Sequence, residues 1–262
     1  LQDLVAETGA DAVYWNRLYE PSAIQRDTEI KQTLRDAAVP TASANASLLF
    51  EPWTVANKQG APFRVFTPFW KTLLALGLPA RPLPQPDLAG RLADPSRFTQ
   101  ESLDALTLLP AIAWDQGIAA AWQPTREAAL GRLDEFLATN LGRYADGRDL
   151  PAKDWVSRLS PYLHFGQLGP REIAAATPQS DSGGLAFLRE LGWREFAYYQ
   201  LYHFPHTTDA PMDARFKDFP WRKADGELRA WQQGQTGIPM VDAGMRELWQ
   251  TGWMHNRVRM VV

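Results

Sequence analysis

The alternation of apolar and polar positions predicts an α/β segment at the start of the chain. Residues 12–15 predict a short strand, and a proline at position 21 opens a charged helix that is expected to reach about residue 37. Residues 46–50 predict a second strand. Because no glycine-rich loop follows either strand, the pattern does not predict a standard dinucleotide-binding fold.

The spacing of apolar residues becomes helical from residue 124 onward. A helix is expected to begin at Pro124 and to run to about Leu141. Further helices are expected over residues 171–176, 185–201, 226–233 and 241–250. Residues 79–110 are rich in proline, aspartate, serine and arginine and lack periodicity, which indicates a long surface connection. An α/β part, a connection and an all-helical part are therefore expected.

The last stretch, residues 251–260, is interpreted as a helix with two different faces. Trp253, Asn256, Arg257 and Met260 fall on one stripe at helical spacing, while Met254 and neighbouring valines form an apolar stripe. An indole, an amide, a guanidinium and a thioether together suit stacking on flat rings and hydrogen bonding to their polar edges. The stripe therefore predicts a cofactor or nucleobase site.

A second mixed face lies upstream, where Glu190, Trp193 and Arg194 fall at i, i+3 and i+4. Two interpretations stay open for these residues alone. A Glu with an Arg four residues later is commonly a surface ion pair worth a few tenths of a kcal/mol, and a helical Trp commonly packs in the core. The presence of two such faces in one chain favours the binding interpretation.

Composition narrows the class of protein. The chain is 45% hydrophobic, with no apolar run long enough to span a bilayer and no signal-peptide pattern, so a cytoplasmic protein is expected. The absence of cysteine excludes disulfides, a thiol nucleophile and cysteine-ligated metals. His203 and His206 have a metal-like spacing, but Pro205 interrupts the helix between them, and no metal site is expected. A net charge of −3 means that any DNA contact must come from a local basic groove.

Four motifs lie at residues 158–163, 193–196, 236–245 and 253–260, and a weaker one lies at residues 15–21. In this order and with these gaps they resemble the photolyase/cryptochrome family, and most of all its class I cyclobutane pyrimidine dimer photolyases. The resemblance implies an α/β antenna domain followed by an all-α FAD-binding domain. On this basis we expect residues 1–66 to be the last part of the antenna domain, 67–123 a linker, and 124–262 the first part of the flavin domain.

The resemblance also implies that the chain is an internal fragment. The aromatic-Arg-Arg-Asp-Leu-Arg signature of the family's first strand is missing, and family members continue past the terminal motif. The fragment alone is therefore expected to be inactive and to bind FAD poorly. The residue that faces flavin N5 in the family falls outside the chain.

For the cofactor, the resemblance implies FAD in a bent, U-shaped form. Its expected neighbours are Tyr144, Ser157, Arg158, Leu159, Ser160, Phe187, Arg194, Trp253, Asn256 and Arg259. Ser160, before Pro161, is expected to cap a helix start near the pyrophosphate. Trp231 matches the solvent-side member of the tryptophan chain that reduces the flavin. A core position is the alternative for this tryptophan.

For the substrate, the resemblance implies UV-damaged DNA with a flipped-out pyrimidine dimer. Residues expected around it are Arg148, Glu190, Trp193, Asn256, Arg257 and Met260. The implied activity is a light-driven lyase reaction by a monomeric enzyme, in which reduced FAD donates an electron, Glu190 stabilises the radical anion and the electron then returns.

Two points stay open within the family. A cryptochrome-type photoreceptor without repair activity is the alternative function; His255-Asn256, which stands where many animal cryptochromes carry a His-His pair, favours repair. The resemblance also allows a second, antenna chromophore of folate or deazaflavin type. The folate-contacting pattern is not reproduced near residues 20–23, so the pigment's identity stays open.

Overall fold

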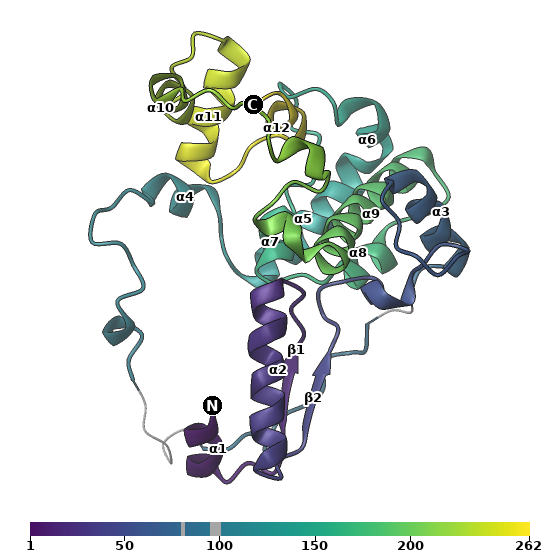
Figure 1. Ribbon diagram of the computed structural model, residues 1–262, viewed down its shortest axis with the longest axis vertical. Coiled ribbons are helices and arrows are strands. Elements are labelled where there is room, and N and C mark those ends of the chain that lie inside the picture. The colour runs from purple at the N-terminus through teal and green to yellow at the C-terminus, as the bar shows by residue number, and fades with distance from the viewer. Residues whose placement is uncertain (80–81, 95–100) are drawn as a thin grey trace. The chain divides into compact units, whose positions relative to one another are not determined.

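The computed structural model describes residues 1–79, 82–94 and 101–262, which divide into two compact units (Figure 1). Unit 1 comprises Leu1–Leu106, Leu168–Thr177 and Leu188–Ala214. Unit 2 comprises Thr107–Gln167, Pro178–Phe187 and Arg215–Val262. Helix α9 (Ser182–His203) supplies its first residues to unit 2 and the rest to unit 1.

Unit 1 begins with the expected α/β elements. After α1 (Gln2–Thr8), strand β1 (Val13–Asn16) pairs in parallel with β2 (Thr41–Ala44), and α2 (Pro21–Asp36) connects them. Figure 1 shows α2 running alongside the two strands. The Trp15 indole donates a hydrogen bond to the largely buried Asp27 of α2 at 3.0 Å, which ties the helix to the strand. The predicted first strand and the helix start at Pro21 are confirmed.

The second strand was predicted at the wrong place. It covers Thr41–Ala44, and residues 46–50 form an irregular loop instead. The backbone N–H groups of this loop are satisfied by side chains rather than by a strand partner: those of Ser47 and Leu48 donate to Asn45 Oδ1, and those of Leu49 and Phe50 to Glu195 Oε2. Leu48 and Leu49 are buried, so the apolar run marked burial rather than a strand.

The core of unit 1 joins α3 (Phe66–Leu76) to α9. Its buried members are Val55, Phe63, Phe66, Phe69, Leu73 and Tyr199. The Tyr199 hydroxyl donates to the Val55 carbonyl at 2.9 Å and accepts from the Phe63 N–H at 3.1 Å. Helix α8 (Pro170–Ala176) begins at a capping box in which Glu172 accepts from the Gly169 N–H at 2.8 Å. The start of the expected linker 67–123 lies within helix α3, and the two boundaries between the three expected segments stay a prediction.

Unit 2 is helical in the residues that the structure describes. Its helices are α4 (Gln116–Ala121), α5 (Arg126–Thr139), α6 (Leu141–Gly147), α7 (Ser160–His164), α10 (Asp225–Gln232), α11 (Pro239–Thr251) and α12 (Asn256–Val261). Short 3₁₀ turns in the chain cover Pro52–Thr54, Asp104–Leu106, Pro205–Thr208 and Ala214–Phe216. The expected helices of the second half are confirmed to within a few residues at their ends.

The terminal helix is shorter than predicted. Helix α11 ends at Gly252, whose left-handed φ of 72° suits glycine, and α12 begins only at Asn256. Trp253 therefore precedes the helix and does not share a helical stripe with Asn256, Arg257 and Met260. His255 caps α12, because its Nδ1 accepts the Arg257 N–H at 3.1 Å.

A small apolar core holds these last helices together. It consists of Val241, Met245, Met254 and Val258. The loop before α11 is held by Asp242, which accepts from the backbone N–H groups of Thr236 at 2.7 Å and of Gly237 at 2.9 Å. The hydrogen bonds from Thr236 lower the pKa of Asp242 and keep it ionised as the acceptor. No helix among the described residues is long and apolar enough to span a membrane.

Candidate functional site

Trp193 on α9 forms an aromatic platform in unit 1. Its indole stacks on the Phe66 ring with centroids 3.7 Å apart and planes 10° apart, and 45% of the residue stays exposed. Glu190 lies one turn earlier on α9 and is half-buried. The stacking distance leaves no room between the two rings, so a further flat ring can stack only on the other face of the indole.

Arg194, a predicted flavin neighbour, has a structural partner in unit 1. Its Nη1 donates to the Ser47 carbonyl at 2.6 Å, and its guanidinium lies 4.9 Å from the Tyr198 ring centroid. These contacts hold the 46–50 loop against α9. A flavin role for Arg194 stays a prediction.

Glu195 was not selected from the sequence, although it is the most unusual side chain of this motif. It is buried, and its Oε2 accepts the Leu49 N–H at 2.9 Å and the Phe50 N–H at 3.3 Å. Burial raises its pKa to about 7, against the lowering effect of those hydrogen bonds and of Arg194 and Arg171. A signal was present in the sequence, because Glu195 falls on the apolar stripe of Leu188 and Leu191.

Two predicted flavin residues, Tyr144 on α6 and Phe187, are brought together in unit 2. Their rings meet edge to face with centroids 5.5 Å apart, and both pack on Phe136 of α5. Both residues are buried. Together with Phe136 they form a buried, closely packed aromatic cluster.

A second pair of predicted flavin residues, Arg158 and Trp253, also lies together in unit 2. The Arg158 guanidinium stacks 4.4 Å from the Trp253 ring centroid and pairs with Asp154 at 3.0 Å. Arg158 adopts a left-handed φ of 51°, which is uncommon for a non-glycine residue and suggests a functional constraint. Trp253 is half-buried. The loop before α7 is therefore bent so that a guanidinium and an indole face each other.

Ser160 does not cap α7 as predicted. Leu159 occupies the N-cap position, no side chain caps the helix, and Ser160 is its first residue. The proline at the next position suits the first turn of a helix, which places the boundary one residue earlier than expected. Leu159 is fully buried and anchors the turn, while Ser157 is partly exposed.

The predicted phosphate contacts Arg257 and Arg148 converge on Asp149 in unit 2. Arg257 donates two hydrogen bonds to the Asp149 carboxylate, at 2.6 and 2.9 Å, and Arg148 pairs with it at 3.3 Å. The hydrogen bonds from Arg257 lower the pKa of Asp149. The side chains of Arg257 and Asp149 are 37% and 51% exposed, so this ion pair lies at the surface.

The remaining predicted residues of α12 reach solvent. Asn256, Arg259 and Met260 are exposed, Met260 by 70%, and the Met260 sulfur lies 3.3 Å from Arg257 Nη1. The capping His255 is buried, and this burial lowers its pKa, so the imidazole stays neutral and Nδ1 can accept its hydrogen bond. His255 was noted in the sequence only as a family marker, and its capping role emerges from the structure.

Trp231 on α10 is partly exposed, and its indole N–H donates to the Val262 carbonyl at 3.1 Å. A second tryptophan of unit 2, Trp221, is far more exposed, at 79% against 36% for Trp231. The outermost tryptophan of an electron-transfer series must be exposed to solvent, and Trp221 is more exposed than Trp231. The role of Trp231 stays a prediction.

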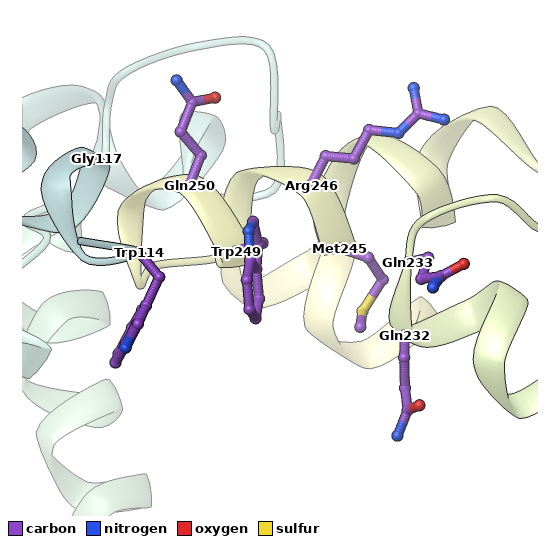
Figure 2. Close-up of a pocket in the computed structure, with 8 residues that line it drawn as sticks. All are labelled: Trp114, Gly117, Gln232, Gln233, Met245, Arg246, Trp249 and Gln250. Atoms are coloured by element: carbon purple, nitrogen blue, oxygen red, sulfur yellow. The ribbon is translucent and has the colours of Figure 1, made fainter. Parts of the chain in front are cut away.

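A surface pocket of unit 2 contains none of the predicted residues. Its volume is about 960 Å³, and it is lined by Trp114, Gly117, Gln232, Gln233, Met245, Arg246, Trp249 and Gln250. Figure 2 shows Trp249 and Met245 projecting from the same side of α11, with Trp114 beside Trp249. The two indole centroids are 6.4 Å apart.

No group of three potential metal ligands occurs among the described residues. The ring of His203, one of the two histidines with metal-like spacing, lies with Nε2 3.1 Å from the Pro52 carbonyl. That contact packs the end of α9 onto the 3₁₀ turn at Pro52–Thr54.

Comparison with known families agrees with this arrangement. A family described as DNA photolyase matches residues 1–87, and one described as FAD binding domain of DNA photolyase matches residues 187–262. The deoxyribodipyrimidine photo-lyase of Agrobacterium fabrum is 40% identical over 100% of this chain and 56% of the relative. Cryptochrome-1 of Arabidopsis thaliana is 35% identical over 100% of this chain and 40% of the relative. The chain thus spans about half the length of these curated relatives.

A solved structure is also similar. The bacterial class III photolyase from Agrobacterium tumefaciens superposes with a TM-score of 0.89 at 39% identity, covering 99% of this chain and 55% of that one. The chain therefore belongs to the photolyase/cryptochrome family. The predicted fold class, an α/β antenna part followed by a helical FAD-binding part, is confirmed. The finer assignment to class I stays a prediction, since the solved relative is of class III.

Proposed function

We propose that this protein repairs cyclobutane pyrimidine dimers in DNA, using light and reduced FAD. The observation that carries the proposal is the platform of Trp193, an indole whose one face is held by Phe66 while nearly half of the residue meets solvent. Exposed indoles that stack on bases are a common means of holding unpaired nucleotides. Membership of the photolyase/cryptochrome family and 40% identity to a photo-lyase support the same reading.

The residues of unit 2 fit FAD by their chemistry. Among the described residues, the hydroxyl groups of Ser157 and Ser160 make no hydrogen bond within the chain and are available as donors to a pyrophosphate. Arg158 adds a positive charge beside the Trp253 indole, and Tyr144 with Phe187 adds an aromatic wall. A guanidinium, two hydroxyls and aromatic rings are a suitable donor set for a dinucleotide with two ring systems.

When bound, reduced FAD would supply light-driven donation of an electron to the dimer and recovery of that electron after ring opening. The chain's own residues would bind and orient. Trp193 would stack on one face of the dimer, and Glu190 and Asn256 would hydrogen-bond the base edges. A dimer has lost normal stacking, so extruding it from the duplex costs less than flipping an intact base.

Arg257 and Arg148 would contribute phosphate contacts that position the DNA without reading its sequence. Both arginines face the Asp149 carboxylate, so a phosphate would have to share or replace this partner. The exchange is favourable at low salt, because a DNA phosphate brings release of condensed counterions.

The experiment that tests this proposal is Trp193→Ala measured on two oligonucleotides that differ only in one thymine dimer. Loss of one stacking aromatic should weaken binding to the damaged duplex by about 1–3 kcal/mol and leave the undamaged duplex nearly unchanged. Trp249→Ala, which removes an indole that is 70% exposed and lies outside the predicted site, is the matched control and should change neither affinity. Equal losses for both duplexes with Trp193→Ala would assign the indole to a structural role.

A photoreceptor without repair activity is the second candidate, supported by 35% identity to Cryptochrome-1 of Arabidopsis thaliana. Blue-light repair of the dimer oligonucleotide separates the two. Restored thymines favour the photolyase reading, and flavin photoreduction without repair favours the cryptochrome reading. A cytoplasmic monomer is part of the same proposal, and sedimentation of the purified protein tests the monomeric state.

A second, antenna chromophore is also part of the proposal, and its type stays open. A cavity of about 150 Å³ in unit 1 is lined partly by Arg17 and Tyr19, which come directly after the carboxyl end of β1, and by Trp53. Ligands of α/β folds commonly bind at this end of a parallel strand. The volume is below the usual range of about 300–1,000 Å³ for small-molecule sites, so it would admit part of a folate or deazaflavin rather than the whole pigment.

A further inference from the structure

Phe66, a residue outside every predicted site, stacks directly on the Trp193 ring. The two planes are 10° apart with centroids 3.7 Å apart, so the phenyl ring lies against one face of the indole. Phe66 is itself buried, whereas Trp193 is 45% exposed. The contact between the two rings therefore connects the buried core of unit 1 to its exposed surface.

The phenyl ring is fixed from several sides. Trp70, one turn later on α3, has its ring plane within 9° of Phe66 with centroids 6.2 Å apart, and Phe196 of α9 meets Phe66 at a steep angle. Trp70 in turn packs on Gly192, where an added Cβ would lie 2.5 Å from the indole carbon Cε3. The planes of Trp70, Phe66 and Trp193 thus run nearly parallel, and Trp193 is the most exposed of the three residues.

The segment that carries Phe66 is tied to α9 by hydrogen bonds as well. Tyr199 accepts the Phe63 N–H at 3.1 Å, and the Gln200 side chain donates to the Phe63 carbonyl at 2.8 Å. These bonds hold the residues just before α3 at a set height along α9. The position of the Phe66 ring beside Trp193 therefore depends on these backbone hydrogen bonds as well as on the packing of the ring itself.

We propose that Phe66 is a positioning residue for Trp193, which fixes the indole in the orientation that stacks on a pyrimidine dimer. The inference rests on the proposed function, in which Trp193 holds the lesion. A ring that is already immobilised loses little side-chain freedom when a ligand stacks on it, so a preset indole binds more tightly than a mobile one. Face-to-face ring contact supplies this restraint, and we expect an aliphatic side chain of similar volume to supply less of it.

The test replaces Phe66 by leucine, which keeps an apolar side chain but removes the ring, and compares it with Phe69→Leu. Phe69 belongs to the same buried cluster and packs on Phe63, Phe196 and Tyr199. The probe is a duplex with one thymine dimer and the same duplex without it. Phe66→Leu should weaken binding to the damaged duplex about 2- to 10-fold, the loss expected for one aromatic pair, with the undamaged duplex unchanged. Phe69→Leu should change neither affinity.

A double-mutant cycle distinguishes a positioning role of Phe66 from a purely structural role. In a Trp193→Ala background, Phe66→Leu should cause no further loss of lesion affinity, because the side chain it positions is gone. The inference would be overturned if the losses of Phe66→Leu and Trp193→Ala were additive, or if Phe66→Leu weakened binding to both duplexes equally. A lesion-specific loss of the same size with Phe69→Leu would also overturn it. If Phe66→Leu does not fold, Phe66→Met replaces it, since methionine fills an irregular gap without a ring.

The cycle also separates the two proposals. Unchanged lesion discrimination in Trp193→Ala would overturn the role of Trp193 itself, and the role of Phe66 with it. A clear loss in Trp193→Ala together with full discrimination in Phe66→Leu would overturn only the positioning role.

Discussion

Replacing Glu195 by glutamine tests how strongly burial acts on a carboxyl group that joins α9 to the 46–50 loop. Glutamine keeps the size of the side chain and an oxygen that accepts the N–H groups of Leu49 and Phe50. It cannot ionise. Two cationic side chains act on this carboxyl group: Arg194 of the same helix, whose Nη1 lies 3.6 Å from Glu195 Oε1, and Arg171 of α8. Both lower the pKa of Glu195, and the raising effect of burial outweighs them.

The magnitude follows from the pKa of Glu195, which burial raises from 4.5 to about 7. At about 1.4 kcal/mol per pH unit, this difference corresponds to about 3 kcal/mol. Between pH 4.5 and 7 the folded protein binds the proton more tightly than the unfolded chain does. The free energy of unfolding therefore falls as the pH rises through this window, and the loss is complete above pH 7.

The assay is urea unfolding of the parent protein and of Glu195→Gln at a series of pH values from 4 to 8. The difference in free energy of unfolding, parent minus variant, should fall by about 3 kcal/mol across the series, because other titrating groups cancel. Thr28→Ala, at an exposed position of α2 and without a titrating side chain, is the control and should give a constant difference. A constant difference for Glu195→Gln, or one that rises with pH, would mean that Arg171 and Arg194 outweigh burial and would refute the reasoning.

Two further predictions concern charge and packing. Arg257→Ala should reduce the slope of log affinity against log salt by about one for damaged and undamaged DNA alike. Asp149→Asn, which removes the carboxylate that competes with a phosphate for Arg257, should tighten DNA binding at low salt. Titrations at several salt concentrations measure both effects, and an unchanged slope for Arg257→Ala would remove Arg257 from the phosphate contacts. Gly192→Ala should lower the free energy of unfolding by about 1–3 kcal/mol, because its methyl group meets the Trp70 ring, whereas Gly131→Ala, with open space on α5, should raise it by up to about 1 kcal/mol in the same urea experiment.

Much of the fold could be predicted because it depends on local pattern. The 3.6-residue spacing of apolar side chains is present wherever a helix packs one face, so α5, α9, α10 and α11 were expected close to their actual ends. The proline that starts α2 acts through its own backbone geometry. The 46–50 loop was mistaken for a strand, because an apolar run reports burial and not the source of its hydrogen bonds.

For the candidate site, residue types and spacing drew attention to Glu190, Trp193 and Arg257, and the family resemblance implied their roles. Neither identified the partners of these side chains. The residue that stacks on Trp193 lies on α3, far back in the chain, and no periodicity links Phe66 to α9. Asp149 and Arg257 are 108 positions apart, and Glu195 and Leu49 are 146 apart.

The sequence by itself determined most of the helices and the chemistry available on each, because these depend on neighbours within one or two turns. Its motifs, spread over residues 158–260, indicated the family. The tertiary structure alone decided which ring supports Trp193, which carboxylate Arg257 meets and how far burial raises the pKa of Glu195. Each of these depends on the distance and the solvent exposure of groups that only folding brings together.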